Sequence, residues 1–154
     1  MKVVVVGGTG LIGTKVVGKL NGHGRVAIAA APETGVNTVT GAGLTGALAG
    51  ADGVVDVSNS PSFDDVQAWD FFTTSTANLL SAGAAAGVSH FVALSVVGTD
   101  RLHSGGCFRA KNTQEQLIRD SAIPFSIVRA PQFYDWLIDN ANAPVRRRSR
   151  VSVG

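Results

Sequence analysis

Four glycines follow the first apolar run of the chain closely: Gly7, Gly8, Gly10 and Gly13. Their spacing satisfies both Gly-x-Gly-x-x-Gly and Gly-x-x-Gly-x-x-Gly. Glycines at this spacing let a chain turn tightly and bring its backbone N–H groups up to a diphosphate, because no Cβ atom intervenes. A helix that begins at the same point adds free N–H groups and the positive end of its dipole. The spacing therefore predicts a phosphate-binding loop.

The residues on either side of the glycines make this signal more specific. Val3–Val6 is an uninterrupted β-branched run, typical of a strand buried on both faces. Ile12, Val16 and Leu20 then recur at helical spacing. A strand, a glycine loop and a helix in this order indicate a site for NAD(H) or NADP(H), whereas a P-loop would need a Gly-Lys-Ser/Thr sequence that this loop lacks. A glycine-rich turn without a ligand is the alternative. The expected contacts to the dinucleotide are Gly7, Thr9, Gly10, Leu11, Ile12 and Gly13.

The end of the second expected strand bears on the choice between the two dinucleotides. A carboxylate there would bond the ribose 2′-hydroxyl of NAD, and a basic residue would accommodate the 2′-phosphate of NADP. This chain has Ala31 at that point, which we expect to contact the cofactor, and Glu33 follows slightly late. The missing carboxylate gives a slight preference for NADP and leaves NAD open.

Two further residues are candidates for the reaction itself. Ser95 stands at the carboxyl end of an expected strand, and Lys111 lies on the next expected helix. Both positions face the crevice in which open α/β sheets bind ligands. A lysine there would bond the nicotinamide ribose and lower the pKa of a neighbouring acid. The alternatives are a local hydrogen bond for Ser95, and for Lys111 a solvated ion pair with Glu115 one helical turn later.

The elements that position these residues alternate along the chain, which predicts an α/β fold: a Rossmann-like, doubly wound parallel sheet of about six strands with helices on both faces. Ser62 and Asp65 suggest a capping box at one helix start. We expect one domain over residues 1–139 and a basic, flexible tail over residues 140–154. The expected strands are 3–6, 25–30, 37–40, 53–57, 90–94 and 125–128, and the expected helices after the first are 44–48, 64–86 and 109–120.

Composition limits the other classes of function. The formal net charge is +2, and four arginines between positions 146 and 150 supply much of the positive charge, so the rest of the chain gives little reason to propose nucleic acid as a partner. The single Cys107 excludes an intramolecular disulfide and a multi-cysteine metal site. The apolar run at the N-terminus is too short for a signal peptide, and none of the apolar stretches is long enough to span a bilayer. We therefore expect a cytoplasmic protein with no membrane partner.

Four segments resemble one family: Val3–Gly13, Val57–Phe63, Leu94–Gly98 and Phe108–Lys111 look like an NmrA-like, atypical short-chain dehydrogenase/reductase. The resemblance covers roughly residues 1–138. It implies that the glycine loop binds the pyrophosphate and that Ser58, Asn59 and Ser60 lie along the cofactor. It also implies that a serine, a tyrosine and a lysine act on a carbonyl or quinone-like acceptor.

Ser95 matches the serine of that family and Lys111 matches the lysine, but the tyrosine position is Cys107. The tyrosine acts as general acid when hydride arrives at the carbonyl. A thiol beside Lys111 could donate a proton if its pKa is depressed, but it would stand about 4 Å or more short of a phenol's reach. A nucleophilic Cys107 would have only His103 as a nearby partner, and an inert small residue is the other interpretation.

The resemblance also implies a further lobe of about a hundred residues after residue 138, of which we expect only the beginning in these 154 residues. An incomplete cleft and apolar residues at 133, 134, 136 and 137 favour a homo-oligomer. Two functions stay open: an oxidoreductase that transfers hydride to a small carbonyl or quinone-like acceptor, and a catalytically silent NmrA-like module that senses the redox state of NAD(P)(H). A nucleic-acid contact through the arginine run is a minor third.

Overall fold

A computed structural model describes residues 1–62, 64–99 and 106–131 of the chain. These residues form one sheet of five parallel strands in the order β2-β1-β3-β4-β5. The strands are β1 (Lys2–Val6), β2 (Val26–Ala30), β3 (Gly53–Asp56), β4 (His90–Val96) and β5 (Phe125–Ala130). The helices are α1 (Leu11–Gly22), the 3₁₀-helix η1 (Pro32–Thr34), α2 (Leu44–Leu48), α3 (Asp65–Ala85) and α4 (Gly106–Arg119).

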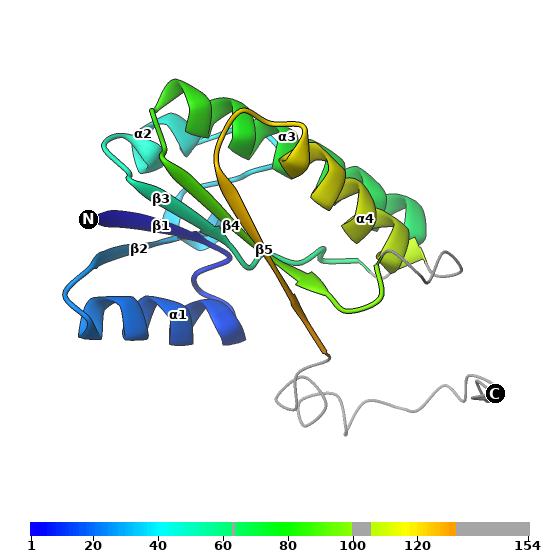
Figure 1. Cartoon of the computed structure of the whole chain (residues 1–154), viewed down its shortest axis with the longest axis horizontal. Helices are drawn as coiled ribbons and strands as arrows, with labels where there is room; N and C mark the ends of the chain where they lie inside the picture. The colour runs from blue at the N-terminus through cyan, green and yellow to red at the C-terminus, as the bar shows by residue number, and fades with distance from the viewer. Residues whose placement is uncertain (63, 100–105, 132–154) are drawn as a thin grey trace.

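The helices cover both faces of the sheet, as Figure 1 shows: α1 lies on one face, and α3 and α4 lie side by side on the other. The strand order reverses at β1, since β2 lies on one side of it and β3 on the other. Ligands of open α/β sheets bind at the carboxyl ends of the strands beside such a reversal. The topology therefore directs attention to the loops that follow β1, β3 and β4.

The core explains why these segments form strands and helices. All four valines of 3–6 are buried, so β1 is covered on both faces as its unbroken β-branched sequence predicts. On the α3 face, Phe91 of β4 packs in one cluster with Leu79 of α3 and Ile118 of α4, and all three are fully buried. Burying three side chains of this size contributes several kcal/mol to the stability of the domain.

The predicted fold class is confirmed, and the number of strands is corrected. Residues 37–40 form a turn, because the side-chain Oδ1 of Asn37 accepts the backbone N–H groups of Val39 and Thr40 at 2.9 and 3.1 Å. An asparagine that bonds its own following backbone in this way competes with sheet pairing. The described residues thus hold five strands instead of about six, and Ser95 stands near the carboxyl end of the fourth strand instead of the fifth.

The predicted capping box at Ser62 and Asp65 is also wrong. Asp64 is the N-cap of α3, and its carboxylate accepts the N–H groups of Val66 and Gln67. The hydroxyl of Ser62 instead accepts the N–H of Asp64 at 3.1 Å. An aspartate caps a helix as well as a serine does, so Asp64 can serve as the N-cap in place of Ser62 without loss of stability.

Several predictions fall on residues that the structure does not describe: those for His103, for residues 133–137, for the domain boundary at 139 and for the basic tail. Among the described helices, none is long and apolar enough to cross a membrane. Within the same residues, no three of the His, Cys, Asp and Glu side chains gather closely enough to hold a metal ion.

Candidate functional site

The glycine loop packs its backbone directly against neighbouring backbone. Gly7 has φ +74°, its N–H donates to Ala30 O at 2.9 Å, and a Cβ added to it would come within 2.8 Å of Ser58 Cα. A Cβ on Gly8 would lie 2.7 Å from Ala29 Cα, and one on Gly13 would overlap the carbonyl oxygen of Gly7. The fold itself therefore requires glycine at positions 7, 8 and 13.

Gly10 differs from the other three glycines. It is exposed, has φ −76° and serves as N-cap of α1, and an added Cβ would meet only the Gly7 carbonyl oxygen, at 3.3 Å. No side chain caps the helix at Gly10, and the first turn of α1 holds no acidic residue. An exposed helix N-terminus without a cap or an acidic side chain favours a bound anion. The space at Gly10 thus fits the pyrophosphate of a dinucleotide.

The adenosine end of the predicted site is formed by η1, which follows β2. The hydroxyl of Thr9 donates to Glu33 Oε2 at 3.3 Å, so the carboxylate of Glu33 lies at the glycine loop. Ala31 is buried, and its N–H donates to Thr34 Oγ1 at 2.9 Å. Glu33, instead of Ala31, therefore offers the exposed side chain at this end of the site.

The loop after β3 lies beside the glycine loop, since Ser58 is the residue that a Cβ on Gly7 would strike. Asp56, the last residue of β3, is buried and accepts both the N–H of Ser58 at 3.0 Å and its hydroxyl at 2.6 Å. Asn59 is exposed, and its Oδ1 accepts the N–H of Ser60. The structure thus brings Ser58, which the family resemblance assigns to the cofactor, next to the glycine loop.

Lys111 is buried on α4 and directed into the protein. Its Nζ donates to Leu94 O and to Gln114 Oε1, both at 3.0 Å, and stands 4.2 Å from the centroid of the Phe72 ring. Gln114 is buried as well, and its Nε2 donates to Asp56 Oδ2 at 3.1 Å. The alternative of a solvated ion pair between Lys111 and Glu115 is therefore wrong.

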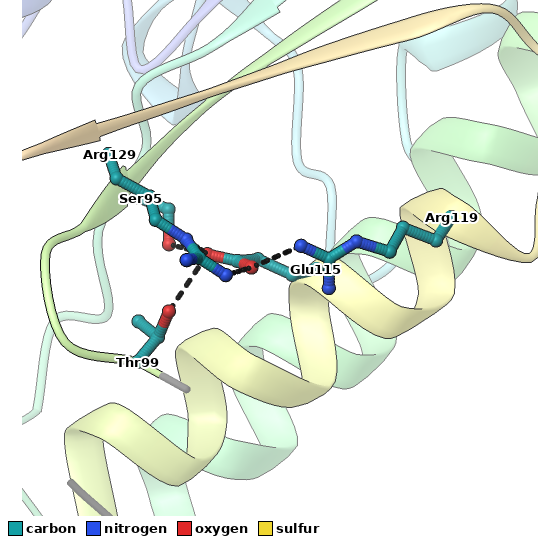
Figure 2. A network of polar contacts seen from close by, with 5 residues as sticks. All are labelled: Ser95, Thr99, Glu115, Arg119 and Arg129. Carbon is teal, nitrogen blue, oxygen red and sulfur yellow. Dashed lines mark hydrogen bonds and ion pairs between the residues drawn. The ribbon is translucent and has the colours of Figure 1, made fainter. Parts of the chain in front are cut away.

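Figure 2 shows that the hydroxyl of Ser95 points to Glu115 and not to open space. Ser95 Oγ donates to Glu115 Oε1 at 2.6 Å, and the hydroxyl of Thr99 donates to the same oxygen at 3.0 Å. Arg129 of β5 and Arg119 of α4 donate to Oε2 at 2.7 and 3.0 Å. One buried carboxylate therefore joins β4, the loop after it, α4 and β5.

The charge state of this carboxylate follows from its donors. Burial by itself would raise the pKa of Glu115, but the hydrogen bonds from Arg129, Ser95 and Thr99 outweigh it and lower the pKa to about 2. Asp56 has the opposite balance, because burial raises its pKa and the hydrogen bond from Ser58 and the charge of Lys111 offset that effect only in part.

Sequence reasoning missed three residues of this region, Asp56, Gln114 and Arg129, and it considered Glu115 only as a solvated partner of Lys111. One signal could have found Gln114 and the burial of Glu115. Positions 111, 114, 115 and 118 fall on one stripe of α4, and the last of these is the apolar Ile118. A stripe that carries a lysine, a glutamine and a glutamate toward the core must pair those groups internally. Cys107 lies in α4, but its side chain is outside the described part of the chain.

The fold and the glycine loop define a doubly wound protein that binds a dinucleotide, and comparison with known proteins names its family. A model of the NAD(P)H-binding family matches residues 7–150, so the chain belongs to that family. It is 35% identical over 144 residues to the (4-alkanoyl-5-oxo-2,5-dihydrofuran-3-yl)methyl phosphate reductase of Streptomyces griseus, and the match covers 85% of this chain and 48% of that protein.

Two solved structures show the same fold. A short-chain dehydrogenase/reductase superfamily protein from Agrobacterium tumefaciens with bound NAD has a TM-score of 0.71 at 23% identity, over 84% of this chain and 48% of that one. The Citrobacter sp. triphenylmethane reductase in complex with NADP(H) has a TM-score of 0.71 at 21% identity, over 90% and 52%. The chain thus spans about half the length of these relatives. The predicted membership of an NAD(P)H-binding family is therefore confirmed, and the two solved structures share the fold.

Proposed function

We propose that this chain is the dinucleotide-binding part of an NAD(P)H-dependent oxidoreductase that reduces a small carbonyl or quinone-like acceptor. The observation that carries the proposal is Gly10. A Cβ atom there would meet one neighbour within 4 Å, the Gly7 carbonyl oxygen at 3.3 Å, yet the residue is a glycine at an uncapped helix start. A diphosphate close to the backbone accounts for both features.

In this proposal the residues of the glycine loop hold the pyrophosphate, and residues 58–60 lie along the nucleotide. Lys111 donates a hydrogen bond to the nicotinamide ribose. Bound NAD(P)H supplies the hydride. The reduction of a carbonyl also needs one proton, which the protein or water must deliver to the oxygen. Ser95 has a single hydroxyl proton and donates it to Glu115, so in this arrangement Ser95 offers an acceptor only its lone pairs. We propose Cys107 or water as the source of the proton.

The acceptor class is proposed from the relative in Streptomyces griseus. The name of its substrate contains an alkanoyl group and an oxo-dihydrofuran ring, and it ends in a phosphate ester. We extend to this chain the coarser feature, a carbonyl group beside an unsaturated ring. The phosphate is left to the test, because the chain spans 48% of that relative.

The second candidate is a module that binds NAD(P)(H) without turning it over. Cys107 at the tyrosine position and the engagement of Ser95 with Glu115 favour it. The reductase activity in the name of the 35% identical relative favours turnover, and we place turnover first.

Both dinucleotides are proposed to bind. The slight preference for NADP rests on the lack of a carboxylate at Ala31, but the contact between Thr9 and Glu33 puts a carboxylate at the glycine loop. That carboxylate would repel the 2′-phosphate of NADP, so it weakens the preference for NADP over NAD. Self-association and a cytoplasmic location stay predictions from the sequence, and gel filtration of the chain tests the first.

The first experiment titrates NADH and NADPH into the chain and follows nicotinamide fluorescence. Absorbance at the nicotinamide band then reports oxidation with a panel of quinones, aldehydes and an alkanoyl furanone with and without its phosphate. Binding with oxidation supports the reductase, binding without oxidation across the panel supports the silent module, and failure to bind either nucleotide refutes both. A gain of turnover in Cys107→Tyr would locate the missing proton donor.

The Gly10→Ala variant tests directly whether the glycine at the start of α1 serves to bind a diphosphate. The added methyl group would meet only the Gly7 carbonyl oxygen, at 3.3 Å, and a slight shift of that oxygen relieves the contact, so the free energy of unfolding should change by less than about 1 kcal/mol. The same methyl group would keep the backbone from the diphosphate, and we expect the affinity for NADH to fall roughly tenfold or more. Urea unfolding and the fluorescence titration measure the two effects. Unchanged affinity in a folded variant would show that Gly10 serves no ligand.

A further inference from the structure

A continuous line of hydrogen bonds, partly buried at Ser58 and buried beyond it, joins the loop after β3 to Lys111 on α4. Ser58 donates from both N–H and hydroxyl to Asp56 Oδ1, at 3.0 and 2.6 Å. The other oxygen of Asp56 accepts Gln114 Nε2 at 3.1 Å, and Gln114 Oε1 in turn accepts Lys111 Nζ at 3.0 Å. The line therefore runs from a residue beside the glycine loop to the predicted catalytic lysine.

Gln114 is the one member of this line that bonds to groups of opposite charge. It is 1% exposed, Asp56 is 1% exposed and Lys111 is 6% exposed. An amide presents a donor and an acceptor at the same time, so it satisfies a carboxylate on one side and an ammonium on the other. A glutamate would lose the donor, and a leucine would lose both groups. Because every group is out of water, a missing partner costs the full desolvation of the group left behind.

We propose that Gln114 is a positioning residue that fixes the ammonium of Lys111 and the Ser58 loop relative to each other by bonding to Lys111 and Asp56 at once. It acts through these two residues and does not itself touch the cofactor. The inference rests on the proposed function in one respect, namely that Lys111 and Ser58 both face the dinucleotide. Asp56 is a positioning residue as well, since its carboxylate accepts hydrogen bonds from Gln114 Nε2 and from Ser58.

This arrangement couples two sides of the cofactor site that lie on different elements. Movement of Lys111 away from Gln114 would leave the amide oxygen without its donor. Movement of the loop would likewise disturb Asp56, which accepts from Ser58 and Gln114 together. A ligand that orders one side therefore favours order on the other, which is a coupling in the thermodynamic sense.

The experiment uses ¹⁵N-labelled chain without ligand. The sequence holds four lysines, Lys2, Lys15, Lys19 and Lys111, so the side-chain ammonium signals are few and Lys111→Arg assigns the relevant one. Gln114→Leu removes both bonds of the amide. The matched control is Gln116→Leu, the same change at an exposed position of the same helix.

In Gln114→Leu we expect the ammonium signal of Lys111 to shift or broaden by faster exchange with water, and the amide signal of Ser58 to shift with it. Gln116→Leu should leave both signals in place. Asp56→Asn covers the case in which Gln114→Leu fails to fold. Its amide group would face Gln114 Nε2 donor to donor, so Gln114 must turn over, and its side-chain amide signal must move together with the Lys111 signal. Unchanged Lys111 and Ser58 signals in the folded variant would overturn the proposal.

A parallel titration with NADH separates this inference from the proposed function. If Lys111 and Ser58 face the dinucleotide, Gln114→Leu weakens NADH binding by roughly 2- to 10-fold, the factor that one lost hydrogen bond corresponds to. Gln116→Leu binds as the wild type does. If the wild type binds neither NADH nor NADPH, the proposed function fails, while the ammonium and Ser58 signals still decide the role of Gln114. Unchanged NADH affinity in a Gln114→Leu variant with a released Lys111 would refute the link to the cofactor.

Discussion

The glycine loop and the buried cluster on α4 lie at the same edge of the sheet, yet they are built in different ways. The glycine loop is made of backbone: Gly7, Gly8 and Gly13 allow close contact, and α1 starts at Gly10 without a side-chain cap. The α4 cluster, which consists of Lys111, Gln114 and Glu115 with their hydrogen-bond partners, is made of side chains. Glu115 alone accepts hydrogen bonds from four other residues. One region leaves hydrogen-bonding groups available to a ligand, and the other satisfies its groups internally.

The difference shows how the two regions contribute to binding and to reaction. A backbone site for an anion needs only a suitable loop and the helix behind it. A reacting centre needs side chains held in one rotamer, and internal hydrogen bonds supply that rigidity. Ser95 and Lys111 are both held in this way, so the α4 cluster would support the proposed reaction site.

The largest effect is expected from Gly13→Ala, which tests whether the loop geometry is required by the fold. The new Cβ would overlap the carbonyl oxygen of Gly7 and lie 2.6 Å from Gly8 Cα, so the loop and α1 must separate. We expect a loss of about 3 kcal/mol in the free energy of unfolding. Urea unfolding followed by circular dichroism measures it.

Gly18→Ala is the matched control for this prediction. It lies in the same helix, and nothing stands within 4 Å of its added Cβ. This variant should be more stable than the wild type by about 0.5 to 1 kcal/mol, because alanine has the higher helix propensity. Equal stability of the two variants would contradict the close backbone contact at Gly13.

The next largest effect is expected in the other region, from Glu115→Gln. The amide keeps the shape of the side chain but removes the charge that Arg129 and Arg119 pair with. We expect a loss of about 2 kcal/mol, which is less than for a fully buried ion pair because both arginines are partly exposed. NADH affinity should fall far less than in Gly10→Ala. A variant with wild-type stability would show that the cluster does not support the fold.

The acid limb of the stability profile tests the charge of the same residue. The folded pKa of Glu115 is lowered to about 2 from an ordinary value of 4.5, so its contribution is fully present above pH 4.5 and is lost as the pH falls toward 2. The free energy of unfolding of Glu115→Gln should therefore fall less steeply than that of the wild type as the pH falls from 4.5 toward 2.

Asp56 has the opposite effect on the pH dependence of the free energy of unfolding. Its pKa is raised by burial, so its ionised form lowers stability, and that cost disappears as the pH falls through the raised pKa. Asp56→Asn should consequently make the acid loss steeper than in the wild type. Urea unfolding at a series of pH values measures both slopes, and parallel curves for the two variants would refute the assignment.

The smallest effect is expected at the adenosine end, where Glu33→Gln removes the carboxylate beside Thr9. Without that charge, the affinity for NADPH relative to NADH should rise roughly 2- to 5-fold, a factor in keeping with one exposed charge in water. Fluorescence titration of both nucleotides gives the ratio. A ratio equal to that of the wild type would place the 2′-position away from Glu33.

Much of the fold could be predicted from the sequence, and less of the site. The strand 3–6, the helix 44–48 and the long helix to residue 85 follow from apolar periodicity and glycine punctuation. The strand expected at 37–40 failed because the Asn37 side chain bonds the backbone that follows it. In the site, Lys111 was found from its position on a helix, but its burial and its bond to Gln114 were not.

The sequence by itself determined the glycine loop, because the contact of Gly13 with Gly7 and the uncapped helix start at Gly10 involve residues that are near one another in the chain. Only the tertiary structure decided the partners of the polar side chains. Ser95 bonds to Glu115 twenty residues later, and Asp56 bonds to Gln114 fifty-eight residues later. Periodicity assigns a residue to a face of its own element, but packing of β3, β4 and β5 against α4 chooses which faces meet.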